Sequence, residues 1–347
     1  MNYVQQKPYQ AGVIASSGAG MAQGPILTMD EAGIASGMAF LVSELEKRDT
    51  KIREPLTSVT YPRDINVNTG GGWVDYISAM SVQYGLTGGA QDGPVTAGGA
   101  NGIPVVQASM GKGLYKAHTF SAALRIMYVD MQKSNFIGRS LDQLLQKGVR
   151  LAYDKHMDAN VYVGLEEYGT TGLLNDPNVT ETTVATNGAA SNASTKWADK
   201  TPEQILQDIN QALTAVWEAG AYDLRAIPNH ILLPYDQYVY ILNTKVTELA
   251  TETILDYVMK NNIAAKNGGD LFIGATAWCK GAGTSGSDRM VVYVNQEDFV
   301  SVDELVPLNR VMSQPVATEG CYDTLYMANI SQVQIYYNQS IGYFDGI

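Results

Sequence analysis

One glycine-rich segment has the letter pattern of a nucleotide-binding loop. Gly281, Gly283 and Gly286 stand at the spacing that lets a backbone turn approach a pyrophosphate in dinucleotide-binding proteins. That chemistry needs a helix directly after the glycines, because the first amides of the helix bind the phosphates. Here the next residues, 289–295, have the composition of a strand. The segment therefore predicts a turn and no cofactor site.

A second segment has the spacing of an acylase nucleophile. Ser109 and Lys112 are three positions apart, as in the serine–lysine pair of β-lactamase-like enzymes. The pair lies in a glycine-rich stretch, however, and no Lys-Thr-Gly partner follows it along the chain. We interpret the match as chance.

The remaining titratable residues do not form a catalytic or metal-binding pattern. His118, His156 and His230 are scattered, without a carboxylate or a second histidine at ligand spacing, and His156 is expected to pack in a core. The adjacent acids 166–167 and 303–304 point apart and are expected to be solvated. We expect no catalytic site, no metal and no cofactor. An acidic α+β enzyme stays as an alternative that would need a pocket with converging polar groups.

Composition narrows the class of protein further. The chain has 347 residues, enough for two domains, and a formal net charge of −12, which disfavours binding to nucleic acid through its phosphates. No apolar run of about 18 residues and no signal-peptide pattern occur, so no membrane association is expected. Cys279 and Cys321 are expected to be buried free thiols. These features predict a soluble product of the cytoplasm.

The longest predicted helix runs from Ser140 to Val163 and begins with a capping box of Ser140 and Gln143. At about 1.5 Å per residue it forms a rod of roughly 35 Å. Residues three and four apart are expected to form its mostly apolar stripe. They are Leu141, Leu144, Leu145, Gly148, Ala152, His156, Ala159 and Val163. The front and back halves of the chain are both expected to attach to this helix.

The residues before this helix offer little that could form a core. Residues 1–29 are expected to be an extended arm, followed by a short helix over 31–47 that Asp30 caps. The next segment, 51–80, has strand composition, but its prolines favour an edge strand or a strap laid over other elements.

A long hairpin is predicted between the strap and the helix. Two β-favouring runs, 73–84 and 114–130, flank a tip over 85–113 that holds nine glycines. Such a ribbon has no core of its own and is marginally stable in water, so it needs another surface to lie on. The residues expected to contact a neighbouring subunit are Trp73, Tyr84, Lys112, Tyr115 and Lys116.

The residues after the helix predict a compact α+β domain. A polar link over 179–196 precedes a helix that Thr201 caps and that ends near Ala219, with Pro202 at its first position. A helix over 252–261 then alternates with strands. The strands are expected within 270–278, 288–295, 298–308 and 321–347.

Two motifs give the chain a family resemblance. The first is Arg-Glu-Pro-Leu-Thr-Ser-Val-Thr-Tyr-Pro-Arg-Asp-Ile over 53–65, with Gly-Gly-Gly-Trp over 70–73. The second, more specific motif is Gly-Leu-Leu-Asn-Asp-Pro-Asn-Val over 172–179. With these motifs the chain resembles the major capsid proteins of tailed phages, most closely the encapsulin-like capsid family with the Hong Kong 97 fold. The resemblance covers nearly the whole chain.

This resemblance implies an α+β fold with five parts. They are an N-terminal arm over 1–65, an E-loop hairpin over 66–130, a peripheral domain with the spine helix over 131–200, an axial domain over 201–309, and return strands of the peripheral domain over 310–347.

The resemblance also implies a structural role in a virion. Pentamers and hexamers of the chain would self-assemble in the bacterial host cytoplasm into an icosahedral shell that encloses double-stranded DNA without sequence-specific contacts. Scaffolding, portal and decoration proteins, where used, would be separate chains. One alternative is an encapsulin-like nanocompartment shell loaded with a cargo enzyme. Another is a tail or fibre protein, for which β-repeats would be expected.

Overall fold

The computed structural model describes residues 58–87, 105–137, 141–189, 193–247 and 252–347, and the structural statements below concern these residues. The chain divides into two compact units, 1–57 and 58–347, and every described residue belongs to the second. The expected arm over 1–29, the expected helix over 31–47 and the tip residues 88–104 lie outside the described residues.

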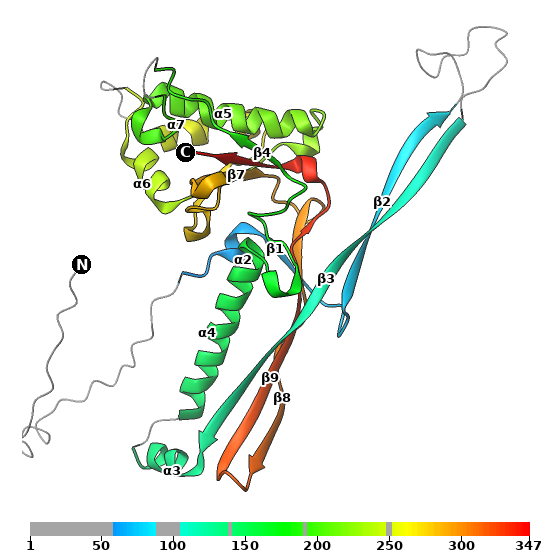
Figure 1. Ribbon diagram of the computed structural model, residues 1–347, viewed down its shortest axis with the longest axis vertical. Coiled ribbons are helices and arrows are strands. Elements are labelled where there is room, and N and C mark those ends of the chain that lie inside the picture. The colour runs from blue at the N-terminus through cyan, green and yellow to red at the C-terminus, as the bar shows by residue number, and fades with distance from the viewer. Residues whose placement is uncertain (1–57, 88–104, 138–140, 190–192, 248–251) are drawn as a thin grey trace, which may run out of the picture. The chain divides into compact units, whose positions relative to one another are not determined.

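The first sheet is built around β3, a strand that runs from Val105 to Met127 (Figure 1). Its first half pairs with β2 (Tyr76–Thr87) in a regular antiparallel register, which confirms the predicted hairpin. The expected bounds are corrected: strand pairing extends into the expected tip over 85–113, as far as Thr87 and Val105, and β3 ends at Met127 instead of near 130. From Ala117 onward the same strand pairs with β9 (Cys321–Ser331). One continuous strand therefore belongs both to the hairpin and to the body of the sheet.

The strands of this sheet lie side by side in the order β1-β8-β9-β3-β2. β8 (Val300–Val316) pairs with β9, and β10 (Gln334–Ile335) pairs with β8. At the edge, β1 (Asn66–Thr69) runs parallel to β8, as the prolines beside it predicted. The short helix α3 (Tyr128–Ile137) follows β3.

The second sheet has five strands in the order β4-β11-β7-β5-β6. They are β4 (Thr180–Thr183), β5 (His230–Leu233), β6 (Phe272–Ala275), β7 (Arg289–Tyr293) and β11 (Ile341–Asp345). β7 runs antiparallel to β5 and β11, and the parallel pairs are β4–β11 and β5–β6. The strand β4 corrects the expectation of a polar link over 179–196. Its four side chains are all exposed and polar, so no apolar alternation marked it in the sequence.

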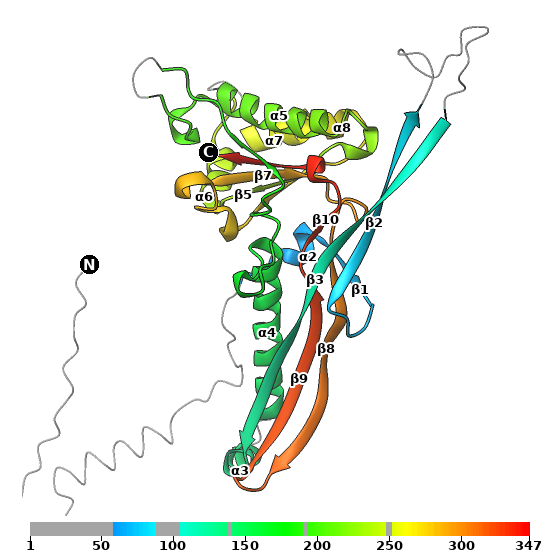
Figure 2. The same cartoon turned by 45° about the vertical axis from the view of Figure 1, so that its right-hand side comes forward.

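Alternate residues of the second sheet pack into two different cores. Ile231 and Leu233 of β5 pack under α5 (Pro202–Ala219) and its neighbouring helices, while Leu232 faces the end of the long helix α4. Those neighbours are α6 (Tyr235–Asn243), α7 (Ile254–Lys260) and α8 (Ile263–Lys266). Figure 2 shows α5, α7 and α8 along one face of the sheet. The capping box of Thr201 and Gln204 opens α5 as predicted.

The long helix α4 runs from Leu141 to Tyr162, close to its predicted bounds, but a different face is buried. Leu144 and Val163 from the expected stripe are 40% and 41% exposed. The buried residues are Tyr153, Met157, Asp158, Asn160, Val161 and Tyr162. Tyr153 and Met157 pack against β9. The expected stripe was wrong because it passed over Tyr153, Met157 and Val161. It also did not allow for Asp158 and Asn160, polar residues that are buried with hydrogen-bond partners.

Candidate assembly surface

The large apolar side chains exposed on the β2–β3 hairpin all lie on one face. Residues two apart in a strand point to the same side, and the register joins Met80 to Lys112 and Val82 to Met110. Even-numbered residues of both strands therefore share a face. Seven large apolar residues there are each between 41% and 76% exposed. This apolar face of the hairpin consists of Tyr76, Met80, Val82, Tyr84, Val106, Met110 and Leu114.

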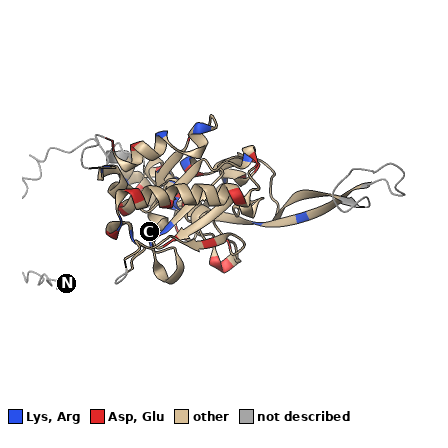
Figure 3. Cartoon of the chain, turned by 90° about the horizontal axis from the view of Figure 1, so that it is seen from above, with Lys and Arg blue, Asp and Glu red and all other residues tan. Residues whose placement is uncertain are grey.

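The opposite face of the hairpin carries mostly small or polar residues, for example Ser81 registered with Gly111. Within strands β2 and 105–116 of β3, the charged residues are Lys112 and Lys116, both basic, although the chain has a net charge of −12 (Figure 3). Lys112 pairs with Met80 and Lys116 with Tyr76, so both lie at the apolar face. A contiguous exposed apolar surface of this kind marks an interaction site. A second copy of this acidic chain would complement its charge.

The five residues expected at an intersubunit contact fall into two groups. Trp73, Tyr84 and Lys112 are exposed, with Trp73 at 54% and Tyr84 at 76%. Tyr115 and Lys116 have partners within the chain. The sequence analysis missed Met80, Met110 and Leu114, which period-two alternation from Tyr84 and its strand partner would have placed on the same face. Of these three, only Met110 lies within the expected tip over 85–113; Met80 and Leu114 lie in the two expected strands.

Tyr115 and Lys116 hold the base of the hairpin. The Tyr115 hydroxyl donates to the carbonyl oxygen of Ile335, 2.8 Å away. The Lys116 amine donates to the carbonyl oxygens of Tyr168 at 2.9 Å and Gly169 at 3.3 Å, at the end of the 3₁₀ turn η1 (Glu166–Tyr168). These contacts fix the point from which the ribbon leaves the sheet.

Two histidines also meet at the base of the hairpin. The spacing of the histidines in the sequence gave no sign that two of them would meet. The Nε2 atoms of His118 on β3 and His156 on α4 are nevertheless 3.3 Å apart. Tyr168 stacks on His118, and Phe120 packs on His156. Burial, with the nearby His156, lowers the pKa of His118 to about 4, and burial lowers the pKa of His156 as well. Both rings are therefore neutral near pH 7, and one donates to the other.

The first sequence motif fastens the start of the described chain to α4. Asp158 of α4 accepts through Oδ1 from the backbone nitrogens of Thr60 at 2.9 Å and Tyr61 at 3.1 Å. Its Oδ2 accepts from Nε1 of Trp278 at 2.6 Å. One buried carboxylate thus joins the strap, the long helix and the loop after β6.

A second buried carboxylate, Asp64, completes this junction. Asp64 lies in the short helix α2 (Tyr61–Asp64) and is 0% exposed. Arg63 donates to its two oxygens at 2.6 and 2.9 Å, the Tyr162 hydroxyl donates to Oδ2, and the Tyr293 hydroxyl donates to its backbone carbonyl. Removing one partner of a buried charge lowers the stability of a fold by about 3–5 kcal/mol. The fold therefore requires an acid at position 64 together with its hydrogen-bonding partners.

The second sequence motif closes the end of α4. Asn175 Oδ1 accepts from the backbone nitrogen of Gly172 at 2.7 Å, and its Nδ2 donates to the carbonyl of Val163 at 2.7 Å. Leu173 and Leu174 are buried in the core under the second sheet. A Cβ on Gly172 would lie 2.4 Å from the carbonyl carbon of Tyr162, so only glycine fits. The two motifs together fix α4 against the second sheet.

Neither catalytic letter pattern forms a reaction site. Gly283 and Gly286 bound the short turn around η5 (Thr284–Gly286), which leads into strand β7 as expected. Ser109 and Lys112 lie on opposite faces of β3, because they are an odd number of positions apart in a strand. In the described part of the chain no three His, Cys, Asp or Glu side chains gather as metal ligands. Both cysteines are buried free thiols.

No helix among the described residues has the length and apolar character needed to cross a lipid bilayer.

Several solved structures, from phages and from a GTA particle, share this arrangement of elements. The capsid of Myoviridae phage XM1 matches with a TM-score of 0.72 at 14% identity, covering 88% of this chain and 98% of that one. The capsid of a native GTA particle matches with a TM-score of 0.61 at 12% identity, covering 92% and 99%. A chain of Microbacterium phage Oxtober96 matches with a TM-score of 0.59 at 12% identity, covering 91% and 99%. The fold is the Hong Kong 97-type capsid fold, as the resemblance implied.

This fold, with a ribbon whose apolar face has no partner among the described residues, defines a shell-forming capsid subunit. The sequence itself matches the family model of the major capsid protein over residues 93–347. The chain belongs to the major capsid protein family and is a subunit of a phage shell. Comparison with curated protein sequences gives no match.

Proposed function

We propose that this chain assembles by laying the apolar face of its hairpin on a neighbouring copy. The observation that carries the proposal is the position of seven exposed large apolar residues on one side of the ribbon. Fully burying a valine, leucine or methionine side chain stabilises a complex by about 1.5–3 kcal/mol. The apolar face therefore supplies a large part of the association free energy, against the loss of translational freedom. Trp73, Tyr84 and Lys112 belong to this contact.

The proposed assembly consists of pentamers and hexamers that close into an icosahedral shell around double-stranded DNA. In it, the axial domain over 201–309 meets its equivalents at the local symmetry axis, and the hairpin within 66–130 crosses to the next subunit. Residues 131–200 and 310–347 form the peripheral domain, and residues 1–65 form the N-terminal arm.

The proposed shell encloses DNA and does not read its sequence. The net charge of −12 supports a container whose subunits do not neutralise phosphates. Scaffolding, portal and decoration proteins, where present, are separate chains, and assembly takes place in the cytoplasm of the bacterial host. The subunit has no catalytic step in this proposal.

The experiment that tests this function is assembly of the purified chain, viewed by negative-stain electron microscopy. Closed particles with five- and six-fold capsomers are expected. A chain that stays a compact monomer at high concentration would refute the proposal.

Particle contents separate the two kinds of shell. Particles from phage-producing cells should contain double-stranded DNA. Particles that hold a cargo enzyme and no DNA would establish the nanocompartment alternative.

A further inference from the structure

The second sheet has two structurally different ends. β4, β5, β6 and β11 run in one direction, as the parallel pairs β4–β11 and β5–β6 and the antiparallel pairs with β7 require. The start end therefore carries the segments before β5 and β11, the turns η3 (Leu224–Ala226) and η6 (Asn338–Ser340). The finish end carries the segments after β5 and β6, helix α6 and the turn η4 (Ala277–Cys279). Surfaces at these two ends face away from each other.

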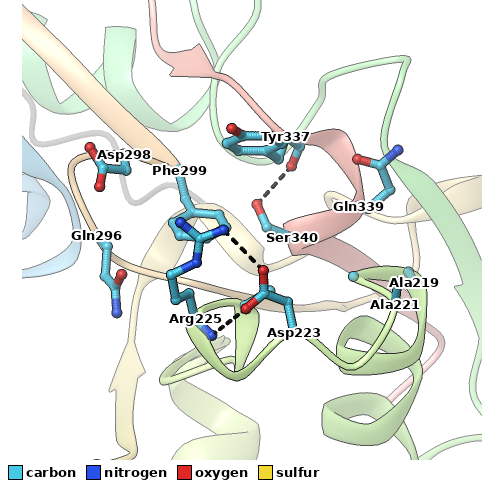
Figure 4. Close-up of a pocket in the computed structure, with 12 residues that line it drawn as sticks. Ala219, Ala221, Asp223, Arg225, Gln296, Asp298, Phe299, Tyr337, Gln339 and Ser340 are labelled. Atoms are coloured by element: carbon cyan, nitrogen blue, oxygen red, sulfur yellow. Dashed lines mark hydrogen bonds and ion pairs between the residues drawn. The ribbon is translucent and has the colours of Figure 1, made fainter. Parts of the chain in front are cut away.

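The start end is concave. A cavity of about 500 Å³ opens there, and its lining includes Asp223, Arg225, Asp298 and Tyr337. Figure 4 shows the Asp223–Arg225 ion pair among these lining residues. A second cavity of about 450 Å³ shares Asp298 and Tyr337 with the first and reaches Tyr115 at the base of the hairpin. The two cavities together form one surface, here named the start groove.

The finish end carries an exposed, partly apolar helix face. Tyr235, Val239 and Leu242 of α6 are 42%, 49% and 42% exposed. Positions i, i+4 and i+7 lie on one face of a helix, so these side chains form a single row. Beside them Asp236 forms an ion pair with Lys280, and both side chains are about two-thirds exposed, at 66% and 64%. This row and ion pair are here named the finish ridge.

The groove and the ridge complement each other in polarity and charge. Next to the groove lining, Tyr222 is 53% and Leu224 is 71% exposed, so an apolar rim meets an apolar row. Each surface also carries one solvent-exposed ion pair, and two such pairs can exchange partners across an interface: Arg225 with the acid of the ridge, and Asp223 with its lysine.

We propose that the finish ridge of one copy of this chain seats in the start groove of the next copy. This inference rests on the proposed function and adds the surfaces through which neighbouring second sheets meet. Because the two surfaces are different and lie at opposite ends of one sheet, the contact is head-to-tail and repeats from copy to copy. Such a contact closes into a ring when the rotation that relates one copy to the next is a whole-number fraction of 360°.

The groove also relates this contact to the hairpin. Its far part is lined by Ile77, Ala79 and Met80 of β2, at the base of the ribbon. A copy seated in the groove therefore lies at the side from which the hairpin leaves. Ile77, Ala79 and Tyr115 lie on the face of the ribbon opposite the apolar face, so the groove and the apolar face make separate contacts.

Site-specific crosslinking of assembled protein tests this contact. Val239 is replaced by a benzophenone amino acid, and the labelled chain is grown in ¹⁵N medium and mixed with unlabelled wild-type chain before assembly. After irradiation, mass spectrometry should find crosslinks from ¹⁵N peptides to ¹⁴N peptides that contain residues 219–226, 296–299 or 337–340. The control places the same group at Gln211, on the exposed face of α5, and should give no crosslink to these peptides.

Two substitutions give an independent measurement. Val239→Asp and Leu224→Asp change exposed residues on the two surfaces, so each subunit should fold like the wild type, which circular dichroism checks. Each should raise the subunit concentration needed for assembly by about tenfold or more, because a charge enters an apolar contact. Gln211→Asp adds the same charge on α5 and should leave that concentration unchanged.

The outcomes separate this inference from the proposed function. Closed shells whose Val239 crosslinks map elsewhere, or normal assembly of both substituted chains, would overturn the contact and leave the shell function standing. Groove crosslinks in open oligomers that never close would support the contact and refute the closed shell.

Discussion

The substitution Met110→Asp tests the assembly surface most directly. Met110 lies in the middle of the apolar face and is 70% exposed in the subunit. A change at an exposed position alters the free energy of unfolding by about 0.5 kcal/mol or less. In an assembled contact the same change loses roughly 1.5–3 kcal/mol of side-chain burial and adds the cost of desolvating an unpaired carboxylate. Since about 1.4 kcal/mol corresponds to a factor of ten, assembly should weaken at least roughly tenfold per contact.

The matched control for this test is Ser109→Asp, which adds the same charge one residue away on the opposite face of β3. Thermal unfolding followed by circular dichroism should give the same midpoint for both variants and the wild type. Sedimentation of each chain over a concentration series then measures assembly. Met110→Asp should remain unassembled where the wild type forms particles, and Ser109→Asp should assemble nearly as well as the wild type. Equal assembly by both variants would show that the apolar face is not a contact surface.

Three further predictions concern the hairpin, the long helix and the histidine pair. Trypsin should cut free subunits rapidly after Lys112 and cut shells there slowly; equal rates in both states would mean that no neighbour covers the ribbon. Met157→Ala should lower the free energy of unfolding in urea by about 2–5 kcal/mol, whereas Leu144→Ala should change it by about 0.5 kcal/mol or less; equal losses would show that the buried face of α4 is misassigned. Because the folded-state pKa of His118 is lowered to about 4 from 6.5, the neutral ring stabilises the fold fully above pH 6.5, and this contribution is lost as the pH falls toward 4. The melting temperature of the wild type should therefore fall more than that of His118→Gln over this range, and parallel curves would contradict the assignment.

Elements with local signals were predictable from the sequence. The hairpin was marked by two β-favouring runs around a glycine-rich tip, and α5 was marked by its capping box and by proline at the first turn. Their ends depend on turn and cap chemistry, which adjacent residues determine. The end of α4 was recognised in the same way, from the glycine at 164, while Ser140, its expected cap, lies outside the described residues.

Features that depend on contacts distant in the sequence were not predictable in this way. His118 and His156 are 38 positions apart and meet only because β3 packs beside α4. The burial of Asp158 on α4 could not be read from the sequence, because its partners Thr60 and Trp278 lie about a hundred positions away on either side. A pattern of apolar residues alone cannot anticipate a carboxylate that is buried with both oxygens hydrogen-bonded.

The continuity of β3 has a mechanical consequence for the shell. The strand has 23 residues, which at about 3.3 Å per residue spans roughly 75 Å, and it passes from the ribbon into the sheet without a hinge. The ribbon is therefore held only at its base, where Tyr115 and Lys116 form hydrogen bonds with the rest of the subunit, and its outer part projects from there. A load applied to its outer part bends the clamped sheet and the helix α4 behind it. In the proposed shell, where the ribbon lies on a neighbour, elastic strain would therefore pass from one copy to the next, and neighbouring copies would share a deformation.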